Sequence, residues 1–587
     1  MQILNSFQEV LSKIWALELR WPEGVWWFHT LVRFVFPVLA LLILIQAIRS
    51  LLRLPRAGEC WGQLALPGGG SISIDHWENL IGRAPLADIR LDFPTVSRQH
   101  AVLLRDSTGN WRVEDLGSKG GTQVNGVPVV GSAPVRLGDQ LSVGGVELLF
   151  LPISREEEEE LSARRSREAP RPMGWPLVWL SLFQMLSAVQ LLLIGGETMG
   201  FAPLCLPALM GIMWIYYLVL RKMGARGFEM ETIAFFLSTL SLAVTASSAP
   251  QAVLKQLVAI VLGLIFFVIL GIWMREGAPI GKLRWLMAAL AIGLLSVTLV
   301  LGQTKYGASN WIILGPFSFQ PSEVAKIFYI FAGAASLERL FHRRNLSLFM
   351  VLTGVCLVCL AWMSDFGTAC IFFATFLVIA YLRSGDFATL ALLSGGAAFA
   401  GLLVLRFKPY IFRRFASWGH AWEAASTTGY QQTRAMSAAA SGGLIGVGGG
   451  NGWLHNVSAA DTDLVFGILC EEWGLIIAAL AVISILALAV FAARSGRVGR
   501  SAFPTIGACA AGSLLVVQTA LNVFGAMDLL PLTGVTFPFV SNGGSAMLAS
   551  WGLLAFLKGA DTRKRSSFAI RAGEMDQRRG AGDGEKA

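Results

Sequence analysis

Charged residues are scarce in this chain. Asp, Glu, Lys and Arg make up 14% of its 587 residues, against 54% hydrophobic residues and a mean hydropathy of +0.60. Globular domains in water carry about a quarter of their residues as charges. Many apolar runs of about 18 residues or more, each a candidate membrane-spanning helix, are present instead. The composition therefore predicts a polytopic α-helical membrane protein.

Histidine and cysteine are also sparse, and neither is arranged for metal or redox chemistry. The six histidines are dispersed and show no zinc-ligand spacing. Cys356 and Cys359 form a CxxC, but it falls inside an apolar run, where small hydrophobic side chains are the better interpretation. The first apolar run, near Leu31, is followed by Arg49 and Arg53 rather than by a small-residue cleavage site. We therefore expect no cleaved signal peptide.

The apolar runs number thirteen by our count. Several contain glycine or a charged residue, so their boundaries are approximate. The predicted spans are 31–48, 175–195, 201–220, 229–247, 252–273, 284–301, 323–338, 347–362, 367–382, 388–405, 464–492, 502–524 and 535–557.

Basic residues alternate between the loops that join these spans, which predicts the orientation of the chain. Most of the loops on one side (196–200, 248–251, 363–366 and 525–534) carry none, and 302–322 carries only Lys305. Cytoplasmic loops of membrane proteins are enriched in Lys and Arg. The pattern places the N-terminus outside, and residues 52–174 and the C-terminal tail in the cytoplasm. The basic residues on the cytoplasmic side are Arg221, Lys222, Arg226, Arg275, Lys282, Arg284, Arg339, Arg343, Arg344, Arg383, Arg494, Arg497, Arg500, Arg563, Lys564 and Arg565.

One outer loop, residues 406–463, is basic despite its side of the membrane. It contains Arg406, Lys408, Arg413, Arg414 and Arg434. Long loops can be translocated despite positive charge, so an ordinary basic loop is one interpretation. The other is a surface that faces an anion, because the planar guanidinium fork of arginine suits phosphate. The net charge of +9 owes much to the cytoplasmic loops, and we expect no nucleic-acid partner.

Residues 60–153 have a different pattern, typical of a soluble all-β sandwich. Short alternating runs such as Ser71–Ile74 and Val146–Phe150 lie between turns rich in Gly, Asn, Asp and Pro. Four motifs stand out within this segment. They are Ile81-Gly-Arg83, Ser97-Arg-Gln-His100, Asp115-Leu-Gly-Ser-Lys-Gly-Gly-Thr122 and Val124-Asn-Gly126.

In order and spacing these motifs resemble the forkhead-associated (FHA) domain, and the likeness covers essentially the whole segment. The resemblance implies that loops at one end of the sandwich bind a phosphothreonine peptide. Arginine would supply a forked donor and serine a hydroxyl donor to the phosphate. His100 and Asn125 would hold the loops, and Gly120 replaces the asparagine usual in the family, which puts peptide affinity in question. A purely structural sandwich is the alternative. The residues implied in phosphopeptide binding are Arg83, Ser97, Arg98 and Lys119.

Polar and glycine-rich outer loops interrupt the membrane spans between Gln303 and Ser545. Ionisable groups at membrane depth are costly, so such a set indicates a functional site. The pieces are Gly307-Ala308, Trp311-Ile312, Leu314-Gly315, Gln320-Pro-Ser-Glu323, Lys326, Asp365, Gly367-Thr368, Gly429-Tyr-Gln431, Ser441-Gly-Gly443, Thr462-Asp463, Glu471-Glu472, Pro531, Pro538, Ser541 and Gly543-Gly-Ser545.

In their order over residues 229–556 these pieces resemble the SEDS (shape, elongation, division and sporulation) proteins of the RodA/FtsW type. The resemblance implies a core of ten spans that polymerises lipid II, an undecaprenyl-pyrophosphate-linked disaccharide peptide, outside the membrane beside a class B penicillin-binding protein. It implies that Asp365 is catalytic. The substrate-binding candidates are Gln320, Glu323, Lys326, Arg413, Arg414, Gln431, Arg434, Asp463 and Ser541.

The chemistry of these residues suits glycosyl transfer. A carboxylate such as Asp365 can take the proton of the attacking sugar hydroxyl. The departing diphosphate needs cations, from Lys326 and the 406–434 loop or from a divalent Mg or Mn ion. We expect no organic cofactor. Glu323 and Lys326 share a helix face, so they are alternatively a packing ion pair, and Asp365 is alternatively the cap of the following helix.

Four departures from the family pattern remove polar outer residues. Asn310 replaces an arginine, and the other three are Met363-Ser364, Arg434-Ala435 and Ser458-Ala459. Arg434 would restore the positive charge absent at Asn310. The retention of Asp365 favours an active enzyme, and a non-catalytic scaffold or a flippase for lipid-linked precursors are the alternatives.

The predicted organisation follows from these assignments. It consists of an N-terminal anchor (1–55), a cytoplasmic FHA domain (60–153), a charged linker (154–174), an extra helical hairpin (175–220), the SEDS core (229–558) and a basic cytoplasmic tail (559–587).

Overall fold

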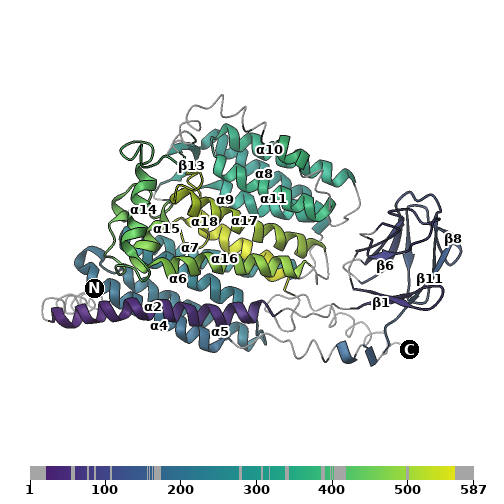
Figure 1. The fold of residues 1–587 in the computed structure, drawn as a ribbon, viewed down its shortest axis with the longest axis horizontal. Helices are drawn as coiled ribbons and strands as arrows, with labels where there is room; N and C mark the ends of the chain where they lie inside the picture. Colours follow the sequence, from purple (N-terminus) through teal and green to yellow (C-terminus); the bar gives the residue numbers. More distant parts are fainter. Residues whose placement is uncertain are drawn as a thin grey trace.

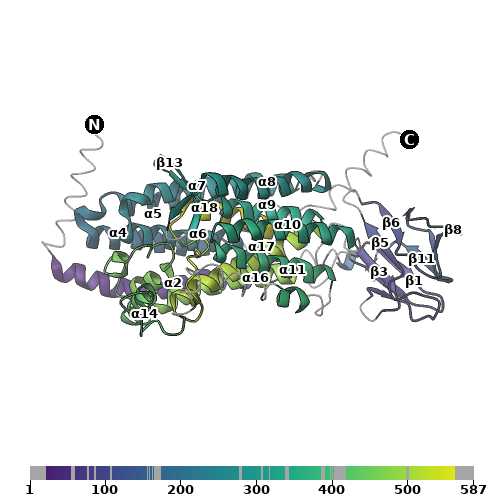
Figure 2. The same ribbon diagram turned by 90° about the horizontal axis from the view of Figure 1, so that it is seen from above.

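The computed structural model describes residues 21–561 with gaps. A bundle of long helices forms most of it, and a β-sandwich lies beyond one end of the bundle (Figure 1). Strand β13 (Ala308–Leu314) and helix α14 (Tyr430–Gly442) lie towards the opposite end, as the second view also shows (Figure 2). The gaps are 54–59, 76–77, 85–86, 106–108, 155, 158, 162, 164–172, 276–279, 306–307, 316, 337–342, 385–390, 397, 399–400, 402–414, 416–417 and 497–501.

The bundle consists of helices with apolar sequences. Ahead of the family-like core lie α2 (Pro22–Leu51), α4 (Gly174–Met199) and α5 (Cys205–Lys222). The core contains α6 (Glu229–Ser248), α7 (Val253–Arg275), α8 (Ile280–Leu301), α9 (Pro321–Ser336), α10 (Arg343–Trp362), α11 (Phe366–Ser384), α14, α15 (Val465–Ile468), the π-helix η4 (Leu469–Trp473), α16 (Leu475–Ser495), α17 (Ala502–Ala526) and α18 (Gly544–Gly559). Single 3-10 turns lie at Ala202–Leu204, Pro250–Ala252 and Leu454–Asn456.

Eight helices of the described residues are long and apolar enough to cross a membrane, which agrees with the predicted fold class. Four other helices, α9, α10, α11 and α18, lie at further predicted spans. The predicted span at 388–405 falls mostly outside the described residues. The count of thirteen spans therefore stays a prediction.

The structure shortens one predicted helical span and shows that another contains a break, although Val465–Ser495 remains long and apolar enough to cross a membrane. The run 535–557 is helical only from Gly544, because residues 531–543 form an irregular segment that contains Pro538 and turns at Phe539, whose φ is +62°. The run 464–492 is not one regular helix, since η4 and Gly474, with φ +88°, separate α15 from α16. Apolar composition alone does not reveal such breaks.

The sandwich packs a six-stranded sheet against a five-stranded sheet. The strand orders are β2-β1-β11-β10-β7-β8 and β4-β3-β5-β6-β9, antiparallel except for the β3–β4 pair. Alternate residues of β11 (Val146, Leu148 and Phe150) are buried, as expected for a strand with one face on a core. The strands are β1 (Gly62–Ala65), β2 (Ser71–Ile74), β3 (Glu78–Gly82), β4 (Ile89–Arg90), β5 (Ala101–Arg105), β6 (Trp111–Asp115), β7 (Thr122–Val124), β8 (Val127–Pro128), β9 (Ser132–Val135), β10 (Gln140–Val143) and β11 (Val146–Leu151).

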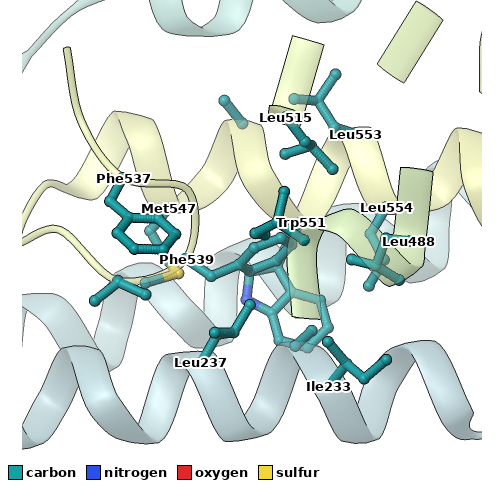
Figure 3. Close-up of a cluster of buried hydrophobic side chains, with 14 of the residues drawn as sticks. Ile233, Leu237, Leu488, Leu515, Phe537, Phe539, Met547, Trp551, Leu553 and Leu554 are labelled. Atoms are coloured by element: carbon teal, nitrogen blue, oxygen red, sulfur yellow. The ribbon is translucent and has the colours of Figure 1, made fainter. Parts of the chain in front are cut away.

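The core of the bundle surrounds Trp551 of α18, which is fully buried. Its ring packs edge-on against Phe235 of α6 and Phe539 of the irregular segment, with centroids 5.3 and 5.9 Å away. Figure 3 shows side chains from α6, α16, α17 and α18 converging on this indole, together with Phe537 and Phe539. The irregular segment is therefore part of the hydrophobic core.

Helix α6 joins the three N-terminal helices to the rest of the bundle. It packs against α2, α4 and α5 and also against α7, α16 and α18, so nearly all of it is buried. Polar contacts reinforce the packing: Ser50 Oγ donates to Glu229 Oε1 at 2.6 Å, and Gln184 Nε2 donates to Thr239 Oγ1 at 2.9 Å. Helices α2, α4 and α5 are thus bound to the core along the length of α6.

A buried ion pair holds α18 to the start of α6. Lys558 Nζ lies 3.1 Å from Glu231 Oε2, with side chains 0% and 2% exposed. Lys558 also donates to the Gly227 carbonyl, and the Tyr216 hydroxyl donates to Glu231 Oε1 at 3.2 Å.

We expect Lys558→Met to destabilise the protein, because it leaves the buried Glu231 carboxylate without its cation. Removing one partner of such a pair costs roughly 3 kcal/mol of unfolding free energy. The midpoint of thermal unfolding in detergent should fall. In the control, Lys558→Met combined with Glu231→Leu, most of the loss should be recovered. An unchanged midpoint in the single variant would contradict this role.

Candidate functional site

Asp365 lies in a tight turn between two helices. Helix α10 ends at Trp362, and Ser364 takes the left-handed conformation with φ +60°, so that the Asp365 amide donates back to the Leu360 carbonyl at 3.0 Å. Helix α11 begins at the next residue, Phe366. The turn therefore places the carboxylate at the N-terminal end of α11, where backbone N–H groups favour a negative charge.

Both carboxylate oxygens of Asp365 are hydrogen-bonded, and the residue is 7% exposed. The Thr368 amide donates to Oδ1 at 3.1 Å, which is the geometry of a helix cap, and Asn310 Nδ2 donates to Oδ2 at 2.8 Å. A carboxylate offers about four lone-pair sites. The capping interpretation of Asp365 is thus confirmed, and it does not prevent the same group from accepting a proton.

Asn310 comes from a small antiparallel sheet between α8 and α9. The sheet comprises β12 (Gln303–Lys305), β13 and β14 (Phe317–Phe319), with β13 in the middle. The Ser309 amide donates to the Met363 carbonyl at 3.0 Å. This bond fixes β13 to the turn that carries Asp365.

The Asp365 turn packs against the irregular segment 531–543. A Cβ atom at Gly367 would lie 2.3 Å from Val535 Cγ2 and 3.1 Å from Thr533 Cβ. Only glycine allows this approach. The glycine that follows the catalytic candidate therefore brings the turn into contact with a second polar region.

That region is held by amide side chains from neighbouring helices. Asn522 of α17 donates to the carbonyls of Asp463, at 3.0 Å, and Val535, at 2.8 Å. Ser541 Oγ donates to the Thr462 carbonyl at 2.7 Å, and Gln256 Nε2 of α7 donates to the Ser541 carbonyl at 3.2 Å. Among the predicted residues, Asp463 and Ser541 are thus brought together.

Lys326 is fully buried on α9 and has protein partners. Its Nζ lies 2.7 Å from Glu323 Oε1 and 3.1 Å from Gln518 Oε1. Gln518 Nε2 continues the chain to the Thr536 carbonyl at 3.0 Å. The geometry favours the packing ion pair over a free cation for the diphosphate.

The other substrate candidates lie apart from one another along the chain. Gln320 is 9% exposed, and its backbone amide donates to Ser545 Oγ at 3.2 Å. Gln431 Nε2 donates to the Ser458 carbonyl at 2.9 Å. Arg434 is exposed and lies over the Tyr430 ring, 5.2 Å from its centroid. Arg413 and Arg414 lie outside the described residues.

No group of three His, Cys, Asp or Glu side chains able to hold a metal ion occurs in the described part of the chain. Magnesium is usually bound by one or two carboxylates together with substrate phosphates and waters. A dedicated all-protein site for the expected Mg or Mn ion is therefore not found among these residues.

Sequence reasoning missed three polar residues of this region as site residues. Gln518 and Asn522 are buried four positions apart on α17, and this spacing in an apolar run was a signal that they share a helix face. Asn310 was noted only as a lost charge. Nothing in the sequence indicated that its amide contacts Asp365, because the two residues are 55 positions apart.

Glu471 and Glu472 lie in η4, where they hold the glycine-rich segment 442–452. The amides of Trp453 and Leu454 donate to the two Glu471 carboxylate oxygens, at 3.0 and 3.1 Å, and the Gly450 amide donates to Glu472 Oε2 at 3.1 Å. The carboxylate pair therefore anchors this glycine-rich segment through its backbone amides.

The four predicted phosphopeptide residues of the sandwich lie on adjacent loops. The amides of Arg83 and Ala84 donate to the carbonyls of Ser97 and Arg98, both at 3.0 Å, and the Lys119 amide donates to Ser97 Oγ at 3.1 Å. Arg83, Arg98 and Lys119 are exposed. Because the Ser97 hydroxyl accepts this bond, its own proton remains available to a ligand.

Two buried or partly buried residues organise these loops. The His100 ring is fully buried; it accepts from the Ser97 amide at 3.0 Å and bonds to the Gly121 carbonyl at 3.0 Å. Burial opposes ionisation of Asp115, but hydrogen bonds from Thr122, Ser118 and Gly117 outweigh it and lower the Asp115 pKa. The expectation that His100 holds the loops is confirmed, as is that for Asn125, whose amide bonds to Asp139 at 2.9 Å.

Gly120 departs from the family pattern for a steric reason in this chain. A Cβ atom there would lie 2.8 Å from the Thr95 carbonyl oxygen and 2.9 Å from Gly144 Cα. Any side chain would therefore shift the backbone of the loop. The recognition loop in this protein is built for glycine at this position.

The chain has clear relatives. Residues 213–566 match the family model described as cell cycle protein (FtsW/RodA/SpoVE), and residues 79–144 match that of the FHA domain.

A probable peptidoglycan glycosyltransferase FtsW of Nitrosococcus halophilus is 33% identical over 310 residues, 50% of this chain and 79% of that protein. The one from Tolumonas auensis is 33% identical over 287 residues, 47% and 74% of the two chains. One chain of a solved peptidoglycan synthase complex is 25% identical, with TM-score 0.49, and the match covers 57% of this chain and 98% of that one. The protein belongs to the FtsW/RodA/SpoVE family and carries an FHA domain ahead of the family's membrane core.

Proposed function

We propose that this protein is a peptidoglycan glycosyltransferase that polymerises lipid II at the outer face of the cytoplasmic membrane. One observation carries the proposal. Asp365, the carboxylate implied as catalytic, is held at a helix end by hydrogen bonds from Asn310 and Thr368, and its remaining lone pairs can still accept a proton. The relatives of this chain that are named peptidoglycan glycosyltransferases support the reaction class.

The proposed reaction is an inverting displacement. The hydroxyl oxygen of the acceptor sugar attacks the anomeric carbon of the donor as Asp365 takes the hydroxyl proton. The bond from that carbon to the diphosphate oxygen breaks, and the electron pair leaves with the diphosphate. Because Asp365 is fixed by two hydrogen bonds, it does not need to be ordered in each catalytic cycle.

Among the described cations, Arg434 is the better candidate to bind the leaving diphosphate. It is exposed, whereas Lys326 is buried with Glu323 and Gln518. Arg413 and Arg414 of the same outer loop remain proposed partners for the phosphates. The described residues provide no dedicated metal site, so we assign no step to a divalent ion.

We propose that the FHA domain and the C-terminus are cytoplasmic and that the N-terminus lies outside. The bundle supports this orientation: Arg494 Nη1 donates to the Leu52 carbonyl at 3.0 Å, on the side where α2 ends and the sandwich follows. Strand β13 lies towards the opposite end (Figure 1), and Asn310 of this strand is hydrogen-bonded to Asp365. We further propose a class B penicillin-binding protein as the membrane partner.

The FHA domain is proposed to bind a phosphothreonine protein in the cytoplasm and to link synthesis to Ser/Thr phosphorylation. Backbone hydrogen bonds join the loops that carry Arg83, Ser97, Arg98 and Lys119, which supports this role. Cationic side chains on loops next to a hydroxyl donor suit a dianionic phosphate.

We expect Asp365→Asn to abolish polymerisation without unfolding the protein. Asparagine is as good a helix cap as aspartate, so the turn is kept while the base is lost, and the rate should fall at least about 100-fold. The measurement is polymerisation of labelled lipid II by the purified full-length protein, alone and with candidate class B partners.

Glu423→Gln, at an exposed carboxylate of the outer loop, is the matched control and should keep its activity. Equal activity of wild type and Asp365→Asn would remove Asp365 from the reaction. Absence of polymer from the wild type beside a competent partner would favour the scaffold or flippase alternatives.

We expect Arg83→Ala to weaken binding of phosphothreonine peptides by about tenfold or more, since a charge-assisted hydrogen bond contributes roughly 1.5–3 kcal/mol. Peptide arrays and titration calorimetry on the full-length protein would measure it. Arg112→Ala, at an exposed arginine within β6, should bind as the wild type does. If no phosphothreonine peptide binds the wild type, the sandwich is structural.

A further inference from the structure

Asn310 has an unusual environment for a buried amide. Its Nδ2 donates to Asp365 Oδ2 at 2.8 Å, and the residue is 6% exposed. A carboxylate only accepts hydrogen bonds, so the nitrogen of the amide must face Asp365 and the oxygen must point elsewhere. That oxygen, Oδ1, is buried and has no hydrogen-bond partner among the residues that the structure describes.

A buried acceptor without a partner is costly, and native structures nearly always satisfy such groups. This acceptor lies on the same side chain that contacts the proposed base. A ligand with two neighbouring donors would satisfy the amide oxygen with one donor and a free lone pair of the carboxylate with the other. A sugar presents such donors as hydroxyls on adjacent carbons.

We propose that Asn310 binds the acceptor sugar: Oδ1 accepts a hydrogen bond from a hydroxyl next to the attacking one, while Nδ2 holds Asp365 towards the attacking hydroxyl. The inference rests on the proposed function and deepens it. Asn310 would thereby favour an acceptor that offers a donor at this position, whereas a donor-only side chain such as arginine could not accept this bond.

The surroundings of Asn310 keep the pair rigid. Asn310 lies on the middle strand of the β12–β14 sheet, and its neighbour Ser309 is bonded to Met363, two residues before Asp365. Gly367 packs on Val535 behind the turn. The distance between the Asn310 and Asp365 side chains is therefore fixed, as the binding of two neighbouring hydroxyls requires.

The test compares the wild type with one variant, on lipid II and on deoxygenated analogues of it. Wild type and Asn310→Leu, an apolar side chain of similar shape, would be assayed with labelled lipid II and with analogues deoxygenated beside the attacking hydroxyl. With lipid II we expect the variant to lose about 10- to 100-fold in kcat/KM, within the range for a single oriented hydrogen-bonding group. One deoxy analogue should slow the wild type by a similar factor and slow the variant no further.

Ile313→Ala is the matched control, because Ile313 lies on the same strand with its side chain on the opposite face from Asn310 and is 46% exposed. It should polymerise lipid II at the wild-type rate. The unfolding midpoint of each variant separates loss of binding from loss of fold, and the deoxy analogues test wild-type protein even if Asn310→Leu does not fold.

The outcomes separate this inference from the proposed function. If wild type is active, Asp365→Asn is inactive and the deoxy analogues react as fast as lipid II, the inference is wrong while the glycosyltransferase stands. Additive losses in variant and analogue would also overturn it, because they would show that Asn310 and the hydroxyl act independently. If wild type makes no polymer with any partner, both proposals fall.

Discussion

In the hydrocarbon of a membrane, every backbone N–H and C=O group needs a partner within the protein. Helices meet this need by themselves, but the irregular segment 531–543 does not. Its polar groups are bonded instead by side chains from elsewhere: Gln256 from α7, Gln518 and Asn522 from α17, and Ser550 from α18. These amides and hydroxyls allow a non-helical chain to lie within the bundle, and the packing of Trp551 against Phe539 completes its burial.

The proposed site depends on this arrangement. The irregular segment supports the Asp365 turn through Val535 and Gly367, and it bonds to the Thr462–Asp463 turn through Ser541. The Lys326–Glu323 pair reaches the same segment through Gln518 and Thr536. Motifs that are separate in the sequence thus meet at this one segment of the bundle.

The three N-terminal helices α2, α4 and α5 are packed into the bundle and do not only connect the FHA domain to it. They pack along α6, which is buried almost completely between them and the core. The contact between Ser50 and Glu229 lies where α2 ends, and the chain continues from there to the FHA domain. The end of α2 that leads to the FHA domain is therefore in contact with α6, which Lys558 and Glu231 join to the end of α18.

The sequence by itself determined the fold class, the two domain types and the family, because apolar runs, turn residues and motif order are local properties of the chain. It also indicated Asp365 as the central carboxylate. Only the tertiary structure decided that Lys326 is a buried ion pair, that 535–543 is not helical and that Asn310 contacts Asp365. These facts depend on which segments meet in space. The orphaned Asn310 oxygen, in particular, exists only because β13 folds back onto the end of α10, 55 positions along the chain.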